Sequence, residues 1–401
     1  LSLSTEETQC PSAKNFSEFD VDLHLSGKKT LNMIPSSQYS STGLHQYKWK
    51  RQPYVPPTSL NQTLAPPPIV VDELDINAFE KGRVQTAWIN LVQDGFGEWM
   101  KIPVIIARGV HDGPIYGITA AVHGNELNGV PGIHRLIQHI NIKKLSGAVI
   151  ACPCVNVTGF LSYKRTYRDG RDLNRTFPGK EQGFASQVYC HAVLTKLISH
   201  FEYHIDLHTA SFGRVNSYYV RCDMNDPVVE KFAWLCNPQI ILHNSGQDGT
   251  LRGAATELGI KSITIEVGNP QSFQSRFISW TYAGVRRMLH YLKMYHLSDI
   301  SKKPPNKDNI ILCSSGYWMY TRCGGLLDVY PPVNSFVKKG DLIARVKNIF
   351  GNISEEICAP EDGVIVGKSS NPVAFAGDRV IHLGIPHPEG EPLPEAQGEN
   401  Y

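Results

Sequence analysis

The strongest constraint on the fold is an alternation of apolar, strand-like runs with amphipathic, helix-like stretches. The run 116–122 is almost entirely apolar, as a strand covered on both faces should be, and residues 129–140 carry apolar side chains at helical spacing. The same alternation predicts further strands at 148–155, 203–207, 217–220 and 262–267 and further helices at 185–198, 227–235, 251–258 and 273–295. Ahead of it, the runs 88–92 and 102–108 flank a turn at 94–97 and predict a hairpin. We therefore expect an α/β domain at 71–300 with a mostly parallel sheet covered on both faces.

The regions outside this alternation differ from it in composition. Residues 1–70 are rich in Ser, Thr, Gln, Asn and Pro, which predicts a disordered or surface extension. Residues 301–307 are polar and contain two prolines, so we expect a linker there. Beyond it, short strands separated by turns predict a small all-β domain at 308–390, followed by a tail at 391–401. The strands expected in this domain lie at 316–321, 325–330, 335–337, 342–346, 355–358, 363–368 and 379–383.

Two stretches of the expected β domain, 336–344 and 357–365, resemble the barrel-sandwich fold of biotinyl and lipoyl carrier domains. A carrier needs a lysine in the turn just ahead of the Ala359-Pro360 step, and residues 352–356 contain none. We expect a barrel-sandwich fold without the carrier function.

Charge and cysteine content limit the expected partners and compartment. The net charge is +2 over 401 residues, which gives no reason to expect nucleic acid or an acidic membrane surface as a partner. No run of eighteen apolar residues occurs, so we expect no membrane-spanning helix. The nine cysteines are scattered and odd in number, which indicates reduced thiols and a cytoplasmic protein. Leu1 in place of Met leads us to expect a fragment or a processed product, and homo-oligomerisation stays open.

A His-x-x-Glu pair, His123 and Glu126, directly follows the apolar run 116–122. Imidazole and carboxylate are good ligands for Zn²⁺, and a catalytic zinc needs three protein ligands with one position left open. We expect His208 as the third ligand, because it follows the predicted strand 203–207 and ligands bind beyond the carboxyl ends of such strands. Asp206 shares a strand face with His208 and is placed to orient its ring. The alternative is that His208 is an ordinary hydrogen-bonded histidine at a polar strand end.

Two other predicted strands also end in polar residues. Asn156 follows the strand 148–155, and Glu266 lies near the end of the strand 262–267. We expect both to face the same mouth, with Asn156 among the residues that contact the substrate. Burying a carboxylate at the end of an apolar strand costs free energy unless the carboxylate has an ionic or hydrogen-bonding partner or a catalytic role. We therefore expect Glu266 to act as a general base. The alternative for Glu266 is a structural salt bridge.

The loop 163–179 carries four arginines within eleven positions, Arg165, Arg168, Arg171 and Arg175. A guanidinium group can hold a carboxylate through two hydrogen bonds, and a second one can stabilise an oxyanion. Beside a metal site we expect such a loop to recognise a carboxylate. The alternative is a generic basic loop.

Four motifs, taken in order, resemble those of the succinylglutamate desuccinylase and aspartoacylase family, a branch of the zinc carboxypeptidase-like fold. They are His-x-x-Glu at 123–126, Asp-Leu-Asn-Arg at 172–175, Asp-Leu-His at 206–208 and Glu-Val-Gly at 266–268, and the resemblance covers about residues 75–390. It implies one Zn²⁺ per chain bound by His123, Glu126 and His208, with Glu266 as the base that activates the zinc-bound water. The stretch 117–132 further resembles the subgroup that includes N-acetyl-diaminobutyrate deacetylases.

The same resemblance implies roles for the arginine loop. Asn174 and Arg175 would hold the substrate's carboxylate, and an arginine further upstream would polarise the scissile carbonyl. The loop departs in length from the aspartoacylase pattern, so three residues are candidates for polarising the carbonyl: Arg165, Arg168 and Arg171. We favour Arg165.

The function expected from these residues is hydrolysis of a small N-acyl amino acid or a related amide. Arg214 and Arg221 could add a second contact to an anion. The family resemblance further implies that the β domain narrows the mouth of the site and so favours small acylated amino acids over peptides. One alternative is a carboxypeptidase with the same metal site and an open mouth. Another is a catalytically silent binding protein that keeps the fold as a scaffold.

Overall fold

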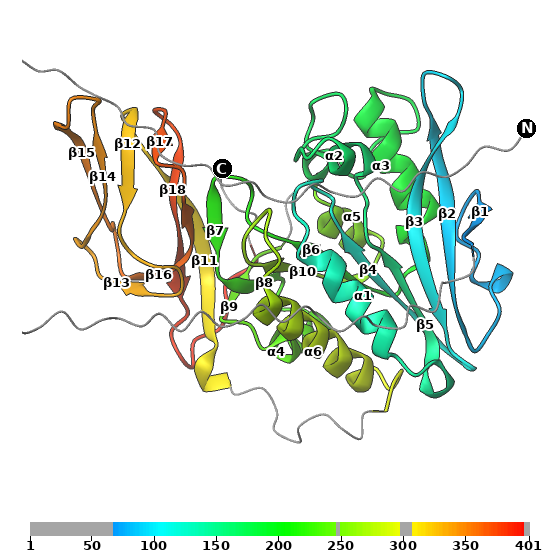
Figure 1. The fold of residues 1–401 in the computed structure, drawn as a ribbon. Helices are drawn as coiled ribbons and strands as arrows, with labels where there is room; N and C mark the ends of the chain where they lie inside the picture. Colours follow the sequence, from blue (N-terminus) through cyan, green and yellow to red (C-terminus); the bar gives the residue numbers. More distant parts are fainter. Residues whose placement is uncertain (1–66, 246–248, 297–306, 397–401) are drawn as a thin grey trace, which may run out of the picture. The chain divides into compact units, whose positions relative to one another are not determined.

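A computed structural model describes residues 67–245, 249–296 and 307–396 of the chain (Figure 1). The extension predicted at 1–70 and the linker predicted at 301–307 lie almost entirely outside the described residues, as does half of the predicted tail at 391–401. The domain boundaries proposed from the sequence therefore stay predictions.

A fourteen-stranded sheet runs through the described part of the chain. Its strands, in spatial order, are β1 (Ile69–Val71), β2 (Arg83–Gln93), β3 (Trp99–Arg108), β5 (Ser146–Cys152), β4 (His111–Ala120), β6 (Tyr203–His208), β10 (Lys261–Val267), β8 (Tyr218–Cys222), β9 (Ile240–His243), β11 (Ile311–Tyr320), β18 (Arg379–Pro386), β16 (Gly363–Ser369) and β13 (Phe336–Val337), with β7 (Arg214–Asn216) paired to β16.

The sheet is mixed, and the expectation of a mostly parallel sheet is not confirmed. The neighbours β5, β4, β6 and β10 are parallel, so their carboxyl ends lie at one edge. The pairs β2–β3, β3–β5 and β10–β8 are antiparallel, as are the pairs that join β11, β18, β16 and β13. The physical reason is partly local, because the five residues 94–98 that join β2 to β3 are too few for the crossover that parallel strands require. The rest follows from the antiparallel strands of the C-terminal region, which continue the same sheet.

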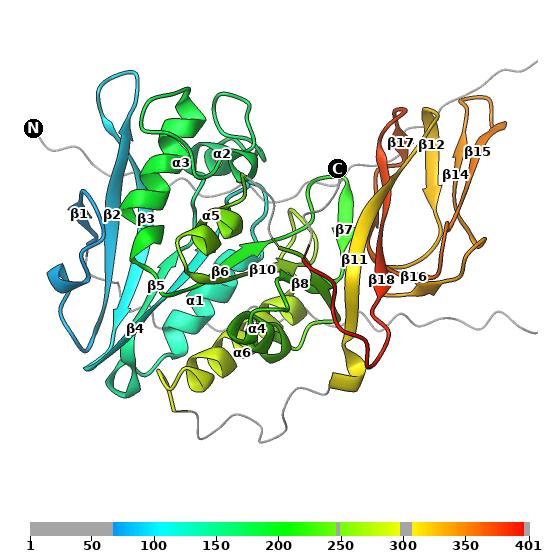
Figure 2. The same ribbon diagram turned by 180° about the vertical axis from the view of Figure 1, so that it is seen from behind.

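Helices cover both faces of the first part of the sheet, in agreement with the prediction (Figures 1 and 2). One face packs against α1 (Gly129–His139), α4 (Pro227–Cys236) and α6 (Ser275–Tyr291), and the other packs against α3 (Ala185–Lys196) and α5 (Leu251–Glu257). The short α2 (Val157–Leu161) follows β5. Single turns of 3-10 helix complete the set: η1 (Ile76–Ala78), η2 (Ile142–Lys144), η3 (Leu173–Arg175), η4 (Ile198–His200) and η5 (Lys307–Asn309).

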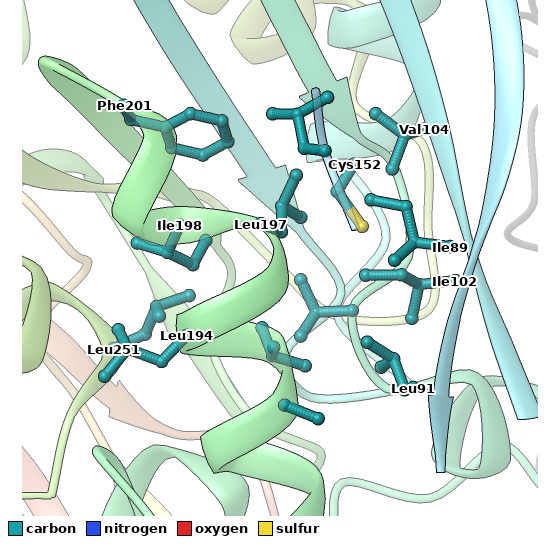
Figure 3. Close-up of a cluster of buried hydrophobic side chains, with 14 of the residues drawn as sticks. Ile89, Leu91, Ile102, Val104, Cys152, Leu194, Leu197, Ile198, Phe201 and Leu251 are labelled. Carbon is teal, nitrogen blue, oxygen red and sulfur yellow. The ribbon is translucent and has the colours of Figure 1, made fainter. Parts of the chain in front are cut away.

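The hydrophobic core holds the parallel strands between these two helical layers. Figure 3 shows one layer of it, where Leu197 faces Ile89 and Ile102 of the hairpin β2–β3 and Leu194 lies beside Leu251. Each such side chain contributes roughly 1.5–3 kcal/mol when it is fully buried. The strand ends that carry the polar residues are therefore fixed from both sides.

The C-terminal region is a β sandwich, in agreement with the prediction of a β-rich domain. A second sheet of β15 (Ile353–Cys358), β14 (Leu342–Lys347), β12 (Gly325–Val329) and β17 (Val373–Ala374) packs on the end of the large sheet. Ile343 and Val346 of β14 meet Ile381 and Leu383 of β18 in the shared core. Neither the two-residue strand β17 nor the joining of β11 and β18 to the large sheet was predicted from the sequence.

No helix within the described ranges has the length and apolar character that crossing a bilayer requires. Eight cysteines in the described part are free, and most are buried. Burial raises the pKa of the Cys154 thiol to about 12, so this side chain stays protonated at neutral pH. The Cys152-Pro153-Cys154 step therefore belongs to the strand and its exit, not to a reactive pair.

Candidate metal centre and active site

Three of the predicted site residues meet where β4 and β6 end side by side. His208 is the last residue of β6, and the loop after β4 carries His123 and Glu126. That loop turns sharply because Ala121 adopts a left-handed φ of 52°, and its carbonyl accepts a hydrogen bond of 2.9 Å from the backbone N–H of Asn156. Gly124 packs directly on the backbone of Gly159, so a Cβ at position 124 would collide with α2.

We call His123, Glu126 and His208 the ligand cluster. Glu126 Oε2 lies 3.0 Å from His123 Nδ1 and 3.1 Å from His208 Nδ1, and the two Nδ1 atoms are 3.2 Å apart. All three side chains are buried. Ligand atoms bound about 2.1 Å from one tetrahedral ion lie roughly 3.4 Å apart, so the cluster fits a small divalent cation with little movement. The three residues could hold a metal ion.

Each imidazole of the ligand cluster is oriented by a carboxylate on its outer side. His123 Nε2 lies 3.0 Å from Asp172 Oδ1, and His208 Nε2 lies 2.7 Å from Asp206 Oδ2. Because a carboxylate accepts the hydrogen bond, each Nε2 donates it, and each Nδ1 faces the centre of the cluster. The role of Asp206 was predicted, whereas that of Asp172 was missed although it begins the Asp-Leu-Asn-Arg motif.

A buried hydrogen-bond chain fixes Asp206 in turn. The Thr119 hydroxyl donates to Asp206 Oδ1 over 2.6 Å, so its oxygen accepts from His204 Nε2 at 2.9 Å. The other nitrogen of His204 is 2.8 Å from the hydroxyl of Ser262, and burial lowers the pKa of His204 to about 4. His204 is therefore neutral and structural.

The charges around the ligand cluster favour a cation at its centre. Burial alone would raise the pKa of the Glu126 carboxyl, but His123, His208 and Arg165 hold that pKa well below its usual range. Burial alone would lower the pKa of His208, but Asp206 and Glu126 raise it well above its usual value. A positive charge on this side chain, supplied by a proton or by a metal ion, is thus stabilised by the fold.

Glu266 lies opposite His208 across the parallel pair β10–β6 and lines the same cavity as the ligand cluster. Its Oε2 accepts a hydrogen bond of 3.2 Å from Asn216 Nδ2, and its Oε1 lies 3.8 Å from Arg221 Nη2. Burial raises the pKa of the Glu266 carboxyl, against the opposing effect of Arg221. A carboxylate whose pKa is raised toward neutrality can both accept and return a proton under physiological conditions.

Only one of the three competing arginines lines the cavity. Arg165 donates from Nη1 to Glu126 Oε1 at 2.7 Å and from Nε and Nη2 to Asp172 Oδ2 at 3.0 and 2.9 Å. Arg168 is exposed, and the guanidinium of exposed Arg171 stacks 4.0 Å above the ring of Phe184. The geometry thus favours Arg165 and places Arg168 and Arg171 outside the cavity.

Asn156 is also outside the cavity, although it was expected to contact the substrate. Its side chain is buried, accepts from Gly159 N at 2.8 Å and donates to the carbonyl of Arg165 at 3.3 Å. The loop 162–179 folds back over Asn156, so its amide holds Arg165 in place from behind. The strand β5 ends at Cys152, three residues before the predicted end, and the position of the following loop could not be inferred from the strand pattern.

The cavity has a volume of about 90 Å³ and includes Asn174, Arg175, Arg214 and Arg221, as expected. Asn174 Oδ1 accepts a hydrogen bond of 2.8 Å from Leu251 N at the start of α5. Several lining residues carried no signal in the sequence, because turns, α5, β11 and β18 bring them together from distant parts of the chain. These are Ser211, Asn244, Thr250, Arg252, Trp318 and Arg379.

Comparisons with known proteins agree on one group of relatives. Residues 112–292 match the family described as succinylglutamate desuccinylase/aspartoacylase catalytic domain. An N-alpha-acetyl-L-2,4-diaminobutyric acid deacetylase from Halomonas elongata is 22% identical over 318 residues, which cover 75% of this chain and 92% of that protein.

Solved structures show the same fold at low sequence identity. A succinylglutamate desuccinylase from a Silicibacter species gives a TM-score of 0.68 at 20% identity, covering 77% of this chain and 96% of that one. The product-bound ectoine utilization protein EutE from Ruegeria pomeroyi gives 0.67 at 20% identity, with the same coverage. The resemblance inferred from the four motifs, including that to the diaminobutyrate deacetylase subgroup, is confirmed.

Proposed function

We propose that the chain, whose residues 112–292 match the family described as succinylglutamate desuccinylase/aspartoacylase catalytic domain, is a zinc-dependent hydrolase that cleaves the amide bond of small N-acyl amino acids. The observation that carries the proposal is the buried ligand cluster, with three ligand atoms 3.0–3.2 Å apart, in one cavity with the carboxylate of Glu266. The deacetylase from Halomonas elongata supports the same class of reaction.

The protein's own residues would hold the metal through His123 Nδ1, His208 Nδ1 and Glu126. When bound, Zn²⁺ supplies Lewis acidity toward the acyl carbonyl and lowers the pKa of a water molecule at its open position. The hydrogen bonds to Asp172 and Asp206 favour a proton on Nε2 of each ring, so a metal ion can take the place of a proton at Nδ1 without a change of tautomer.

Glu266 would move the proton. Its carboxylate takes a proton from the attacking water and delivers it to the nitrogen of the leaving amine, which completes hydrolysis to a carboxylic acid and a free amine. The hydrogen bond from Asn216 orients one carboxylate oxygen and leaves the other toward Arg221 and the cavity.

Arginine side chains would bind and polarise the substrate. Arg165 lies beside Glu126 and is placed to donate to the oxygen of the scissile carbonyl as negative charge develops there. Asn174 and Arg175 line the end of the cavity nearest α5 and would hold the carboxylate of the amino acid.

Metal analysis and a substrate panel test this proposal together. The purified protein should contain one zinc per chain and release free amine from acetylated or succinylated amino acids. A chelator should abolish the release, and added Zn²⁺ should restore it. Cleavage of peptides in preference to small N-acyl amino acids would support a carboxypeptidase instead. Inactivity across the panel at full zinc occupancy would support a binding protein.

A further inference from the structure

Two separate parts of the chain bond to the backbone that directly follows Glu266. The side chain of Asn128, which belongs to the loop of the ligand cluster, donates from Nδ2 to the carbonyl of Val267 over 2.7 Å. The backbone N–H of Ala210, just after β6, donates to the carbonyl of Gly268 over 2.8 Å. The end of β10 is therefore tied to both segments that supply the metal ligands.

Asn128 does not have the role that its position in the chain predicts. It is the residue before α1, where an asparagine side chain usually accepts a hydrogen bond from the first turn of the helix, and it makes no such bond. Its Oδ1 accepts instead from the backbone N–H of Gln274 at 3.1 Å. Its Nδ2 also lies 3.1 Å from Gln274 Oε1 and 3.3 Å from the carbonyl of Asn269. The side chain is 1% exposed, so a buried amide is bonded wholly to the segment that follows the base.

Gln274 continues these contacts back to Glu266. Its Oε1 accepts from the backbone N–H of Asn269 at 2.6 Å, and Asn269 Oδ1 accepts from the backbone N–H of Asn216 at 3.3 Å. Asn216 Nδ2 in turn donates to the carboxylate of Glu266. We call Asn128, Gln274, Asn269 and Asn216 the amide network. All four side chains are neutral, so the network can restrain Glu266 without adding a charge beside the cavity.

The backbone at Gly268 is shaped for this network. Gly268 has a left-handed φ of 76°, and a Cβ at this position would collide with Gln274 Oε1. A residue with a side chain would thus be strained and would also push Gln274 away from the backbone N–H of Asn269. The close approach of Gln274 to the segment after the base depends on a glycine here.

From these contacts we propose that Asn128 is a positioning residue that acts through the amide network on the carboxylate of Glu266. The inference rests on the proposed function, in which Glu266 moves the proton. Because Asn128 shares a loop with His123 and Glu126, the network fixes the base relative to the metal ligands. Proton transfer depends steeply on the placement of the base, so a weakened network should slow the chemical step and leave substrate binding unchanged.

Substitutions of Gln274 test the network with the least risk to folding, because this side chain is only half-buried. Gln274→Met keeps the length of the side chain and removes the acceptor Oε1, whereas Gln274→Glu keeps an oxygen acceptor in the same place. Asn90→Ala is the control. It removes a buried amide that donates to Asp72 over 2.8 Å, on β2 and outside the cavity.

Gln274→Met should lower kcat roughly tenfold, change KM less than about threefold and leave the zinc content at one per chain. Gln274→Glu should keep kcat within about threefold of the wild type, and Asn90→Ala should not change it. A wild-type kcat in Gln274→Met, or an equal loss in Gln274→Glu, would overturn the proposal.

A double substitution shows whether the network acts through the base. In a Glu266→Gln background there is no base to position, so adding Gln274→Met should lower the residual kcat less than about twofold. The same tenfold loss in both backgrounds would mean that Gln274 supports the fold in general, which would also refute the proposal.

Crystal structures of the zinc-loaded protein keep the test independent of activity. In Gln274→Met the carboxylate of Glu266 should be displaced by about 1 Å, while His123, Glu126 and His208 stay in place. If Glu266 moves in this way but Glu266→Gln is fully active, the positioning role stands and the proposed reaction fails. An unmoved Glu266 refutes the positioning role whatever the activity. If Gln274→Met does not fold, Asn269→Ala, which removes the acceptor for the N–H of Asn216, replaces it with the same expected results.

Discussion

The ligand cluster differs in construction from a second group in the same cavity, which consists of Arg214, Trp318 and Arg379 and is called the mouth group. In the ligand cluster, each imidazole has a carboxylate behind it, and Asp206 has a further hydrogen-bond chain behind it. In the mouth group, Arg214 stacks on an aromatic ring and has no ion-pair partner among the described residues. In the first arrangement each charged group has an oppositely charged or hydrogen-bonding neighbour, whereas in the second Arg214 lies near the cations Arg379 and Arg165.

The two arrangements also differ in how the chain produces them. The ligand cluster comes from the ends of neighbouring parallel strands, β4 and β6, inside a core covered on both faces. The mouth group comes from β7, β11 and β18, which are joined by pairing between the two parts of the large sheet. The difference suggests that changes near the ligand cluster alter metal binding and chemistry, whereas changes at the mouth alter the choice of substrate. Four substitutions test this separation.

The largest effect is expected from Glu266→Gln. The amide cannot accept the proton of the attacking water, so kcat should fall by about 10²- to 10⁴-fold while the zinc content stays at the wild-type level. Steady-state kinetics and metal analysis of the same preparation measure both quantities. Glu257→Gln, an exposed change on α5, is the control. Turnover near the wild-type rate would show that Glu266 is not the general base. Loss of zinc would show that Glu266 contributes to metal binding.

Asp172→Asn should act on metal binding. An asparagine can turn its NH₂ group toward His123 Nε2, which would favour the tautomer that protonates Nδ1, and it also loses the ion pair with Arg165. Zinc affinity should fall roughly tenfold to a hundredfold, as judged by competition with a chelating dye. Asp328→Asn, an exposed position on β12, should leave the affinity unchanged. A change in the preference among N-acyl amino acid substrates would show that the two regions are not separable.

The ligand cluster could be predicted from the sequence because its signals are local. Apolar strand runs end directly before His123 and His208, and the carboxyl ends of parallel strands meet at one edge of a sheet. Period-two alternation also placed Asp206 on the same side as His208. The helices on both faces of the sheet and most strands of the β sandwich were predicted for the same reason, since periodicity is a property of a short window.

The rest depends on contacts between distant parts of the chain. Asn156 was assigned to the cavity because it ends a strand, but the loop 162–179 covers it. The mixed sheet was not predicted, because the apolar and polar pattern within β11, β18 and β16 does not reveal that these strands pair in antiparallel fashion and continue the large sheet. Trp318 and Arg379 reach the cavity only through that joining, so neither could be identified from its neighbours in the sequence.

Gly367→Ala tests whether the β sandwich influences the base. A Cβ at position 367 on β16 would collide with Oδ1 of Asn216 on β7, and Asn216 donates the 3.2 Å hydrogen bond to Glu266. Displacing Asn216 should lower kcat about tenfold, because small shifts of a catalytic group are costly, and should leave zinc content unchanged. Gly95→Ala is the matched control, since nothing lies within 4 Å of its added Cβ. A wild-type kcat for Gly367→Ala would show that the packing of the β sandwich on Asn216 does not influence catalysis by Glu266.

The smallest effect is expected from Arg221→Met and appears in the pH profile. Glu266 must be ionised to act, so kcat/KM falls as the pH drops through its pKa, which burial raises. Arg221 opposes that rise because its cation, 3.8 Å away, stabilises the carboxylate. Removing Arg221 should therefore move the acid limb of the profile to higher pH and lower kcat/KM on the alkaline side less than about fivefold.

Tyr219→Phe is the control. It removes the phenol that accepts hydrogen bonds from Arg221 at 2.5 and 3.0 Å but keeps the charge of Arg221, so the acid limb of its pH profile should move less. An acid limb that moves to lower pH in Arg221→Met would mean that a group other than Glu266 limits the reaction in acid.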